Sequence, residues 1–445
     1  MTLKPYCLLL GGVLLTGTLG TSYPSPAPGQ SGPPALDAFE AKVLLALSDA
    51  DMVPSAYVDG QLGPAAGTDV LSVLTFDGYH AQPASVNTLP ISNSVTGPPA
   101  AVTTTPDGRY ALTIETRGPR PASGADVRLA GLANGRTLTV VDLADPRAPR
   151  VVQQVAGPAR ATSVSVSADG TLVALAVHPA GDGTATPLWL YHFTGGQLTG
   201  GAAVPIPGWK AGDELVQALF HPRQPVLALT NGTQHQVLLA QVQPRGAQWQ
   251  LRPWGNVLPI EAGTLLTCFS PDGRFFFANG SAATQPRGVV LGVRLDAKPG
   301  QAGGPVHEVV ARQPTGAIPE GLAISPDGQL LVTTNLEHTY LPVGHPQRGR
   351  YASLSLFAVN QATGALTAAG DFAFDGMLPE SAVFDRSSRR LAVADYGELD
   401  DPTGPGHLDF WRVVGDAHGP EPLRLVKTAH SLPVQRGAHT LALVR

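Results

Sequence analysis

Short apolar runs separated by tight turns recur along the chain from about residue 100 to the C-terminus. The turn Ser270-Pro271-Asp272-Gly273 precedes the apolar run Arg274 to Asn279, and Ser325-Pro326-Asp327-Gly328 precedes Gln329 to Asn335 in the same way. Pro presets the φ angle of a turn and Gly supplies the positive φ that closes it, so each unit predicts an antiparallel hairpin. Four further copies, some with degenerate turns, begin at Thr105, Ser167, His221 and Asp385.

Each hairpin is followed by a third apolar run and a weaker fourth one, which together predict a four-stranded antiparallel unit. The units recur at an average spacing of about 56 residues, which is typical of a repeat architecture. The C-terminal run Ala438 to Val444 aligns with the first strand of a further unit, and the runs Asp69 to Phe76 and Ala84 to Ile91 can complete that unit's sheet. Six internal units and one shared between the termini predict an all-β, seven-bladed β-propeller. An open array or two β domains is the alternative, but no linker or composition shift interrupts Ala84 to Arg445.

The first residues have the pattern of an export signal. Lys4 precedes an apolar run from Tyr6 to Leu15, which small residues follow, so we expect a signal peptide over residues 1–22. A membrane anchor is the alternative, but the run is about half of the roughly 20 residues that a span needs. Residues 23–36 are rich in Pro, Ser and Gly and predict a flexible leader, and residues 37–445 form the propeller. We therefore expect a secreted or periplasmic protein with no transmembrane segment in the mature chain.

The composition of the chain limits the classes of binding partner that we expect. The 29 Lys and Arg against 34 Asp and Glu leave a net charge of −5 without long runs of either sign, so nucleic acid is not an expected partner. The chain has 2 Cys, of which only Cys268 would remain after signal cleavage, which excludes an internal disulfide and a multi-cysteine metal site. We expect a monomer whose ligand is a small-molecule lactone or another envelope ligand or protein.

Three apolar runs that follow the turns carry a family resemblance. The segments Val226 to Asn231, Phe275 to Asn279 and Leu331 to Asn335 resemble the YVTN-type repeats of lactonase-like seven-bladed β-propellers, a family similar to 6-phosphogluconolactonase and carboxymuconate cyclase. The resemblance covers roughly residues 99–445 and implies an exported propeller that hydrolyses a sugar-derived or other small lactone at its central channel. A non-catalytic propeller that binds a ligand or scaffolds a protein in the envelope is the alternative, because the fold alone does not define the chemistry.

The start of each innermost strand faces the channel, so polar residues there are the candidates for catalysis. The repeat register places Glu320, Glu380 and His439 at this point in three consecutive blades, whereas Ala100, Thr162, Val216 and Leu265 stand at the other starts. Family members with lactonase activity usually carry His with Arg and Glu there. We interpret His439 as the general base, with Arg436 or Arg160 as its electrostatic partner and Glu320 and Glu380 as acid/base or cation-binding groups. The alternative is that the two Glu residues are solvated turn residues.

A long insertion after Asn335 predicts a ligand-binding rim loop. Its candidate residues are Glu337, His338, Tyr340, His345 and Arg348. The spacing of the two His residues matches no metal motif, so we predict no metal site there. The sequence shows no required cofactor, and Ca²⁺ is the one ion that the acidic turn Glu398 to Asp401 would suit.

Overall fold

The computed structural model of the 445-residue chain describes residues 37–93, 100–121, 127–179, 186–246, 248–281, 285–296, 306–401, 403–416 and 419–444. The signal peptide and the leader expected over residues 1–36 lie outside the described residues. In the part of the chain that is described, none of the helices has the length and apolar composition that a bilayer crossing requires.

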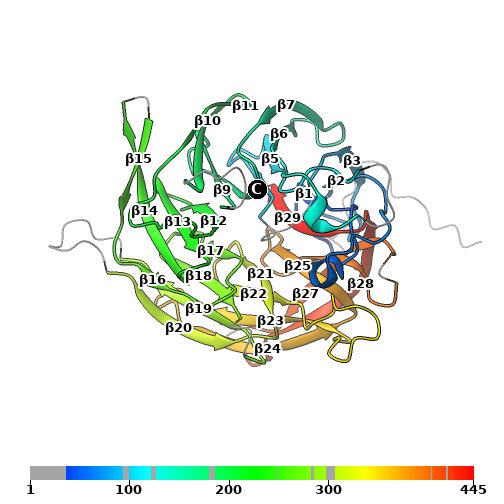
Figure 1. Ribbon diagram of the computed structural model, residues 1–445. Coiled ribbons are helices and arrows are strands. Elements are labelled where there is room, and N and C mark those ends of the chain that lie inside the picture. Colours follow the sequence, from blue (N-terminus) through cyan, green and yellow to red (C-terminus); the bar gives the residue numbers. More distant parts are fainter. Residues whose placement is uncertain are drawn as a thin grey trace, which may run out of the picture.

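Seven antiparallel sheets stand in a ring around a central channel, so the predicted seven-bladed propeller is confirmed (Figure 1). We number the blades in chain order, with the blade shared between the termini as blade 7. Blades 1 to 3 comprise β4 (Val102–Thr104), β5 (Tyr110–Ile114), β6 (Thr137–Asp142) and β7 (Arg150–Ala156); β8 (Ala161–Val166), β9 (Leu172–Val177), β10 (Leu188–Thr194) and β11 (Gln197–Ala203); and β12 (Leu215–Phe220), β13 (Val226–Asn231), β14 (Gln236–Arg245) and β15 (Gln248–Pro253), with β16 (Leu258–Pro259) paired to β14.

Blades 4 to 7 follow the same plan. They comprise β17 (Thr267–Phe269), β18 (Phe275–Gly280), β19 (Val289–Arg294) and β20 (Glu308–Pro314); β21 (Pro319–Ile324), β22 (Leu330–Asn335), β23 (Ala352–Val359) and β24 (Leu366–Phe374); β25 (Gly376–Phe384), β26 (Arg390–Glu398), β27 (Gly406–Val414) and β28 (Arg424–Val434); and β29 (Ala438–Val444), β1 (Val43–Ser48), β2 (Val70–Thr75) and β3 (Ser85–Pro90). The described residues outside the strands include a one-turn helix, α1 (Ala56–Asp59), and a 3₁₀ turn, η1 (Leu129–Gly131).

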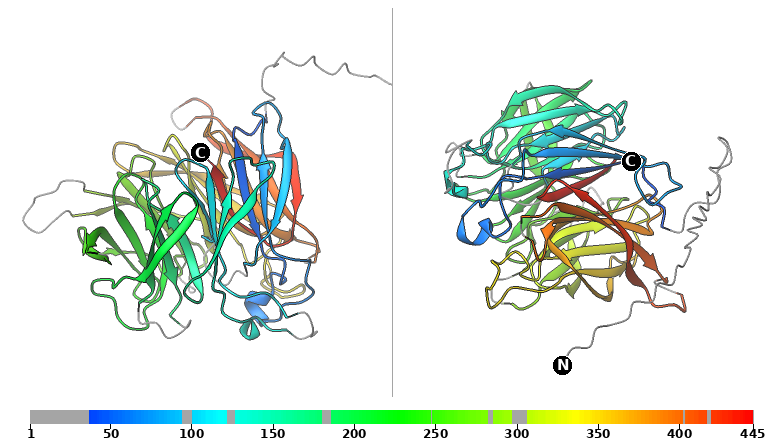
Figure 2. Two further views of the ribbon diagram at one scale, coloured as in Figure 1. Left: turned by 90° about the horizontal axis from the view of Figure 1, so that it is seen from above. Right: turned by 90° about the vertical axis from the view of Figure 1, so that its right-hand side faces the viewer.

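Blade 7 closes the ring by pairing the C-terminal strand with N-terminal strands, as expected. The sequence pattern identified β2 and β3 but missed β1, which lies between β29 and β2 and pairs with both. In Figure 2 the red C-terminal strand lies beside the blue N-terminal strands. β1 is a continuous apolar run that no Pro-Asp-Gly turn precedes, so it lacks the turn motif that located the other blades.

The apolar cores lie between neighbouring blades rather than within each sheet. One cluster joins blades 2 and 3, another joins blades 3 and 4, and a third joins blades 5 and 6. Each blade thus buries its faces against its neighbours, and closure leaves no innermost strand without a partner sheet.

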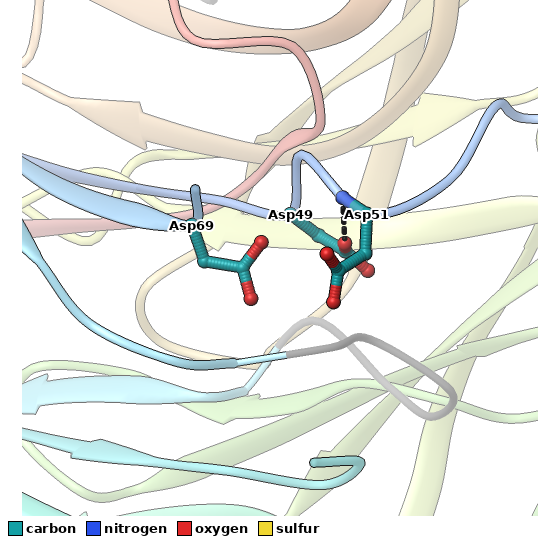
Figure 3. A group of neighbouring side chains, drawn as sticks. All are labelled: Asp49, Asp51 and Asp69. Atoms are coloured by element: carbon teal, nitrogen blue, oxygen red, sulfur yellow. Dashed lines mark hydrogen bonds between the residues drawn. The ribbon is translucent and has the colours of Figure 1, made fainter. Parts of the chain in front are cut away.

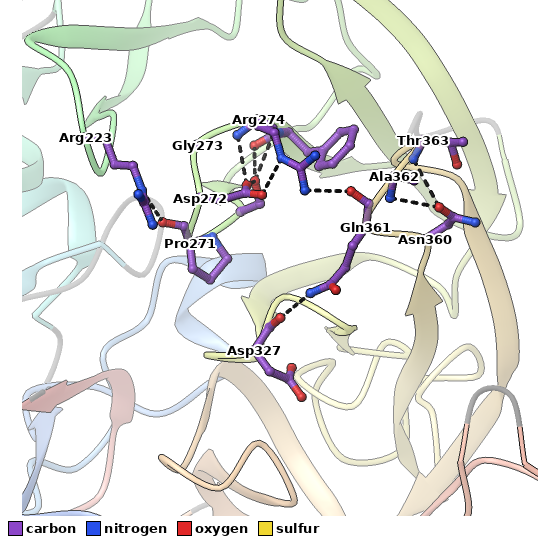
Figure 4. Close-up of polar contacts among 12 residues, drawn as sticks. Arg223, Pro271, Asp272, Gly273, Arg274, Asp327, Asn360, Gln361, Ala362 and Thr363 are labelled. Atoms are coloured by element: carbon purple, nitrogen blue, oxygen red, sulfur yellow. Dashed lines mark hydrogen bonds and ion pairs between the residues drawn. The ribbon is translucent and has the colours of Figure 1, made fainter.

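The Pro-Asp-Gly turns are linked to one another around the lower rim (Figure 4). The Oδ1 atom of Asp272 accepts hydrogen bonds from the Ser270 hydroxyl at 2.6 Å and the Arg274 amide at 3.0 Å, which closes the turn. The Arg274 guanidinium also donates to the Gln361 carbonyl at 2.8 Å, and the Gln361 amide donates to the Asp327 carbonyl of the blade 5 turn. The turns therefore fix the spacing of the blades at the end of the channel opposite to the candidate site.

A β-bulge marks the start of the innermost strand in several blades. Single extra residues at Thr162, Val216, Glu380 and His439 interrupt the pairing with the second strand, and in blade 5 Glu320 and Gly321 together oppose one residue. A bulge redirects a side chain away from the regular pleat. The register by which the sequence equated Glu320, Glu380 and His439 is therefore present in the structure. We call the end of the channel where the innermost strands begin the upper mouth.

Candidate functional site

Glu320 and Glu380 lie together in one cavity at the upper mouth. The cavity has a volume of about 320 Å³, and its lining residues come from the starts of β21 and β25, from the rim loop and from α1. The described residues that line it are Tyr57, Leu265, Glu320, Leu336, Tyr340, Leu378 and Glu380. The structure thus brings together two of the four predicted catalytic residues and adds Tyr57, which nothing in the repeat pattern indicated.

Both carboxyl groups are held in their neutral form by burial. Glu320 is 7% exposed, and burial raises its pKa from 4.5 to about 8. Glu380 is 1% exposed, and its pKa is raised well above its ordinary value, first by burial and then by the negative charges of Glu320 and Asp49. The Oε2 atom of Glu380 is buried without a hydrogen-bond partner among the described residues. A buried polar atom without a partner is costly, so the cavity is a place where a ligand would supply one.

Tyr57 and Tyr340 complete the polar lining of the cavity. Burial raises the pKa of Tyr57, and the charges of Glu380 and Tyr396 raise it further. Burial and then the charge of Glu320 also raise the pKa of Tyr340. Both phenols therefore keep their protons at neutral pH and are hydrogen-bond donors. No cation is among the described residues that line this cavity.

His439 lies outside this cavity, fully buried between blade 7 and the loop after β3. Its Nε2 atom lies 2.8 Å from Asn93 Oδ1, and its Nδ1 atom lies 2.7 Å from the Thr440 hydroxyl. The Asn93 amide nitrogen donates to the Ser48 and Ile91 carbonyls, so Oδ1 is the acceptor and His439 donates through Nε2. Burial lowers the pKa of His439 to about 3. Both ring nitrogens are engaged, so we leave the general-base role suggested by the sequence out of the proposal below.

Arg436 is also buried away from the cavity. Its guanidinium donates to the carbonyls of Ala50, at 3.1 Å, and Pro64, at 2.5 Å, on the connection between β1 and β2. Burial lowers the pKa of Arg436. Its contacts fasten this connection over blade 7, which gives Arg436 a structural role in this arrangement.

A group of basic residues, Arg117, Arg160 and His178, lies on another part of the same mouth. Arg117 follows β5, Arg160 precedes β8 and His178 follows β9, and the chain direction of these strands places all three at the upper mouth. Burial lowers the pKa of Arg160, and the charge of Arg117 lowers it further. The pKa of His178 falls to about 4 because of burial and then because of the two guanidinium groups.

Two features of this cationic group are typical of a functional position. Arg160 has a φ of 59°, which is unusual for a residue with a side chain, and the Nε atoms of Arg117 and Arg160 are buried without hydrogen-bond partners among the described residues. Glu214 Oε1 lies 3.7 Å from His178 Nε2. The sequence indicated Arg160 but missed Arg117 and His178, because they follow second strands rather than precede innermost ones.

The rim loop separates the 320 Å³ cavity from a larger one. Tyr340 faces the smaller cavity, whereas Arg348 lines a cavity of about 750 Å³ against blade 6. Glu337 accepts hydrogen bonds from the Ala317 amide at 3.1 Å and the Ser353 hydroxyl at 2.7 Å, which anchors the loop. His338 and His345 line neither cavity. Of the five predicted rim-loop residues, one therefore reaches the carboxyl pair.

Among the described residues, three carboxylates lie close enough together to bind one metal ion: Asp49, Asp51 and Asp69 (Figure 3). They do not belong to the predicted acidic turn. One oxygen from each carboxylate lies within 4.8 Å of the others. Burial, followed by the charge of Asp51, raises the pKa of Asp69 to about 7. The Asp69 oxygens accept hydrogen bonds from the Ala50 and Asn93 amides, both at 2.9 Å. These contacts hold the connection between β1 and β2 against the loop after β3.

The fold is a seven-bladed β-propeller with a candidate site at its upper mouth. No protein-family profile matches the chain, and no curated protein matches it in sequence. Among solved structures it is similar to a candidate 6-phosphogluconolactonase from Bacteroides uniformis, with a TM-score of 0.59 and 15% identity over 91% of this chain and 99% of that one. It is also similar to a periplasmic gluconolactonase from Pseudomonas aeruginosa, with a TM-score of 0.56 and 18% identity over 89% of this chain and 98% of that one. The predicted resemblance is confirmed at the level of the fold, which is what these identities show.

Proposed function

We propose that the protein hydrolyses small lactones in the 320 Å³ cavity at the upper mouth, with Glu320 and Glu380 as the acid/base pair. The observation that carries the proposal is the pair of buried carboxyl groups, one with an unpartnered oxygen, facing a single cavity. The likeness of the fold to proteins described as lactonases supports the choice of reaction. Two titratable groups whose environments separate their pKa values are the usual basis of acid and base roles.

The two carboxyl groups divide the reaction between them. We assign the base to Glu320, whose ionised form takes a proton from water while the water oxygen adds to the lactone carbonyl carbon. Glu380 stays protonated and gives its proton to the ring oxygen when the acyl C–O bond breaks. The product is a hydroxy acid, and transfer of the proton from Glu320 to Glu380 restores the starting state.

Tyr57 and Tyr340 are the groups that can stabilise charge on the carbonyl oxygen. Their raised pKa values keep both phenols protonated, and a partly buried donor stabilises an oxyanion more than a fully solvated one. Arg117 and Arg160 lie at the same mouth and provide positive charge for the carboxylate product.

The test is a pH-stat assay of the full chain on a panel of unsubstituted and substituted γ- and δ-lactones. We expect Glu320→Gln and Glu380→Gln each to lower kcat/KM on the order of 100-fold or more. The matched control is Glu308→Gln, because Glu308 is an exposed residue of β20, far from the upper mouth in the topology. We also expect wild-type kcat/KM to rise with pH up to about 8, as Glu320 ionises, and this rise to be absent in Glu320→Gln. Equal activity in the three variants would show that the carboxyl pair takes no part in the reaction.

A second candidate function is ligand binding without catalysis. The 750 Å³ cavity between Arg348 of the rim loop and Lys427 of blade 6 favours it, because this cavity is larger than the one with the carboxyl pair. Activity on no lactone, together with partner capture that depends on residues 336–350, would favour this alternative. Export is part of both proposals, and sequencing the N-terminus of the protein from its host would test cleavage near residue 22.

A further inference from the structure

The central channel continues below the carboxyl pair as a second cavity. This lower cavity has a volume of about 360 Å³ and is lined by the innermost strands of all seven blades. Along β21 and β25, Glu320 and Glu380 face the upper cavity, whereas Leu322 and Ala382, two residues further on, line the lower one. Two residues of a strand advance by about 7 Å, so the two cavities lie one above the other along the same strands.

Aliphatic side chains from six blades line the lower cavity, together with a smaller set of polar ones: Thr103, Ser165, Gln217, Thr267, Ser381 and Thr440. Val102, Val164, Leu219, Leu266, Ile324 and Leu443 come from six different blades. A sugar phosphate has no charged partner in such a lining. A channel with this composition favours an apolar occupant, because hydrocarbon leaves water at a gain of about 0.8 kcal/mol per CH₂.

The polar side chains in the channel are already occupied by bonds within and between blades. The Gln217 side-chain oxygen accepts hydrogen bonds from the Thr267 amide at 2.9 Å and the Thr267 hydroxyl at 2.7 Å. The Ser165 hydroxyl donates to the Ala218 carbonyl at 2.8 Å, and the Ser381 hydroxyl accepts from the Leu441 amide at 3.1 Å. These groups join neighbouring blades, so part of their hydrogen-bonding capacity is used within the protein.

We propose that the substrate is a lactone with an unbranched alkyl substituent, whose ring binds beside Glu320 and Glu380 and whose alkyl tail extends into the lower cavity. This inference rests on the proposed function for the position of the ring. The upper cavity also presents Leu265, Leu336 and Leu378, and Leu266, which follows Leu265 in the chain, lines the lower one, so both cavities offer apolar side chains to the same tail. The substrate class is therefore an alkyl lactone rather than a phosphorylated sugar lactone.

Chain-length dependence of the kinetics is the first test. We expect kcat/KM on γ-lactones to rise about fourfold for each added methylene, and so about 60-fold from a methyl to a butyl substituent, until the tail fills the channel. Cys268 lines the lower cavity, so Cys268→Phe should fill part of it and flatten this dependence while the methyl lactone is hydrolysed within about threefold of the wild-type rate. Cys268→Ala is the matched control and should keep the dependence. A flat or falling series in the wild type overturns the inference.

Protection of the Cys268 thiol measures binding without turnover. In the full chain with Cys7→Ser and Glu380→Gln, Cys268 is the only thiol and the proposed reaction is slow. Burial raises the pKa of Cys268, so its reaction with methyl methanethiosulfonate, which forms a methyl disulfide and releases methanesulfinate, is followed at alkaline pH. We expect an octyl lactone to slow this reaction and a methyl lactone at the same concentration to leave its rate unchanged.

The two tests separate the inference from the proposed function. Protection by the octyl lactone without hydrolysis of any lactone by the wild type supports the alkyl channel and rejects the hydrolase. Hydrolysis without dependence on chain length supports the hydrolase and rejects the alkyl channel. No hydrolysis and no protection reject both.

Discussion

Replacing Glu320 with Gln should increasingly stabilise the protein relative to the wild type as the pH rises to 8, because the folded wild type must keep a proton that the unfolded chain releases or, above pH 8, bury a charge. The ordinary pKa of a Glu is 4.5, and burial raises that of Glu320 to about 8. Between these two values the folded state binds the extra proton, so its stability is fully present below pH 4.5 and is lost as the pH rises through 8. A difference of 3.5 pH units at about 1.4 kcal/mol each amounts to about 5 kcal/mol. Gln has a similar size and shape and does not titrate.

The assay is urea unfolding of the wild type, Glu320→Gln and the exposed control Glu308→Gln at intervals between pH 4.5 and 9. The difference in free energy of unfolding between Glu320→Gln and the wild type should grow by about 5 kcal/mol from pH 4.5 to 8 and stay level above that. The curve of Glu308→Gln should run parallel to that of the wild type. If Glu320→Gln also runs parallel to the wild type, Glu320 is not buried as a neutral acid, and its role as a base with a pKa near 8 is wrong.

Two further predictions concern buried groups outside the cavity. Asn93→Ala removes the acceptor of the fully buried His439 Nε2–H, so we expect the free energy of unfolding in urea to fall by about 1–3 kcal/mol. The kcat/KM on lactones should stay unchanged. A large loss of activity would indicate that His439 takes part in catalysis. The Lys427 ammonium lies 2.7 Å from the Asp409 carboxylate, which is 2% exposed. Lys427→Met should therefore lower the stability measured by thermal unfolding by about 3–5 kcal/mol, and adding Asp409→Asn should restore most of this loss. Equal losses in the single and double variants would contradict this pairing.

The repeat pattern predicted the fold because each turn carries its own chemistry. Ser270-Pro271-Asp272-Gly273 identifies a hairpin without reference to the rest of the chain, and the same register located Glu380 and His439 at equivalent bulges. The strand β1 carries no such local mark, since its partners β29 and β2 surround it and all of its side chains are buried. Pairing between residues far apart in sequence, as between β1 and β29, leaves no short-range pattern from which it can be predicted.

The fate of His439 depended on a contact that no repeat pattern contains. The sequence placed it beside Glu380 at the start of an innermost strand, and the bulge there is present. The connection between β1 and β2 then covers blade 7: the Asp49 amide donates to the Gly437 carbonyl at 2.8 Å, and Arg436 donates to Ala50 and Pro64. The same connection carries α1 and thus Tyr57 into the cavity. This segment therefore supplies an unforeseen cavity residue, whereas His439 is held outside the cavity by Asn93 in the loop after β3.

The cost of the carboxyl pair is itself an argument that the upper mouth has a function. A penalty of about 5 kcal/mol is comparable to the whole net stability of many domains, which is about 5–15 kcal/mol. Leu or Gln at residues 320 and 380 would avoid this penalty, and the apolar residues Val216 and Leu265 at equivalent starts in blades 3 and 4 are accommodated by the fold. The start of the innermost strand is structurally equivalent in all seven blades. The propeller fold therefore does not explain why acids stand at this position in two blades and apolar residues in others. Buried acids at two neighbouring starts, facing one cavity, are thus better explained by the chemistry of a ligand than by the stability of the propeller.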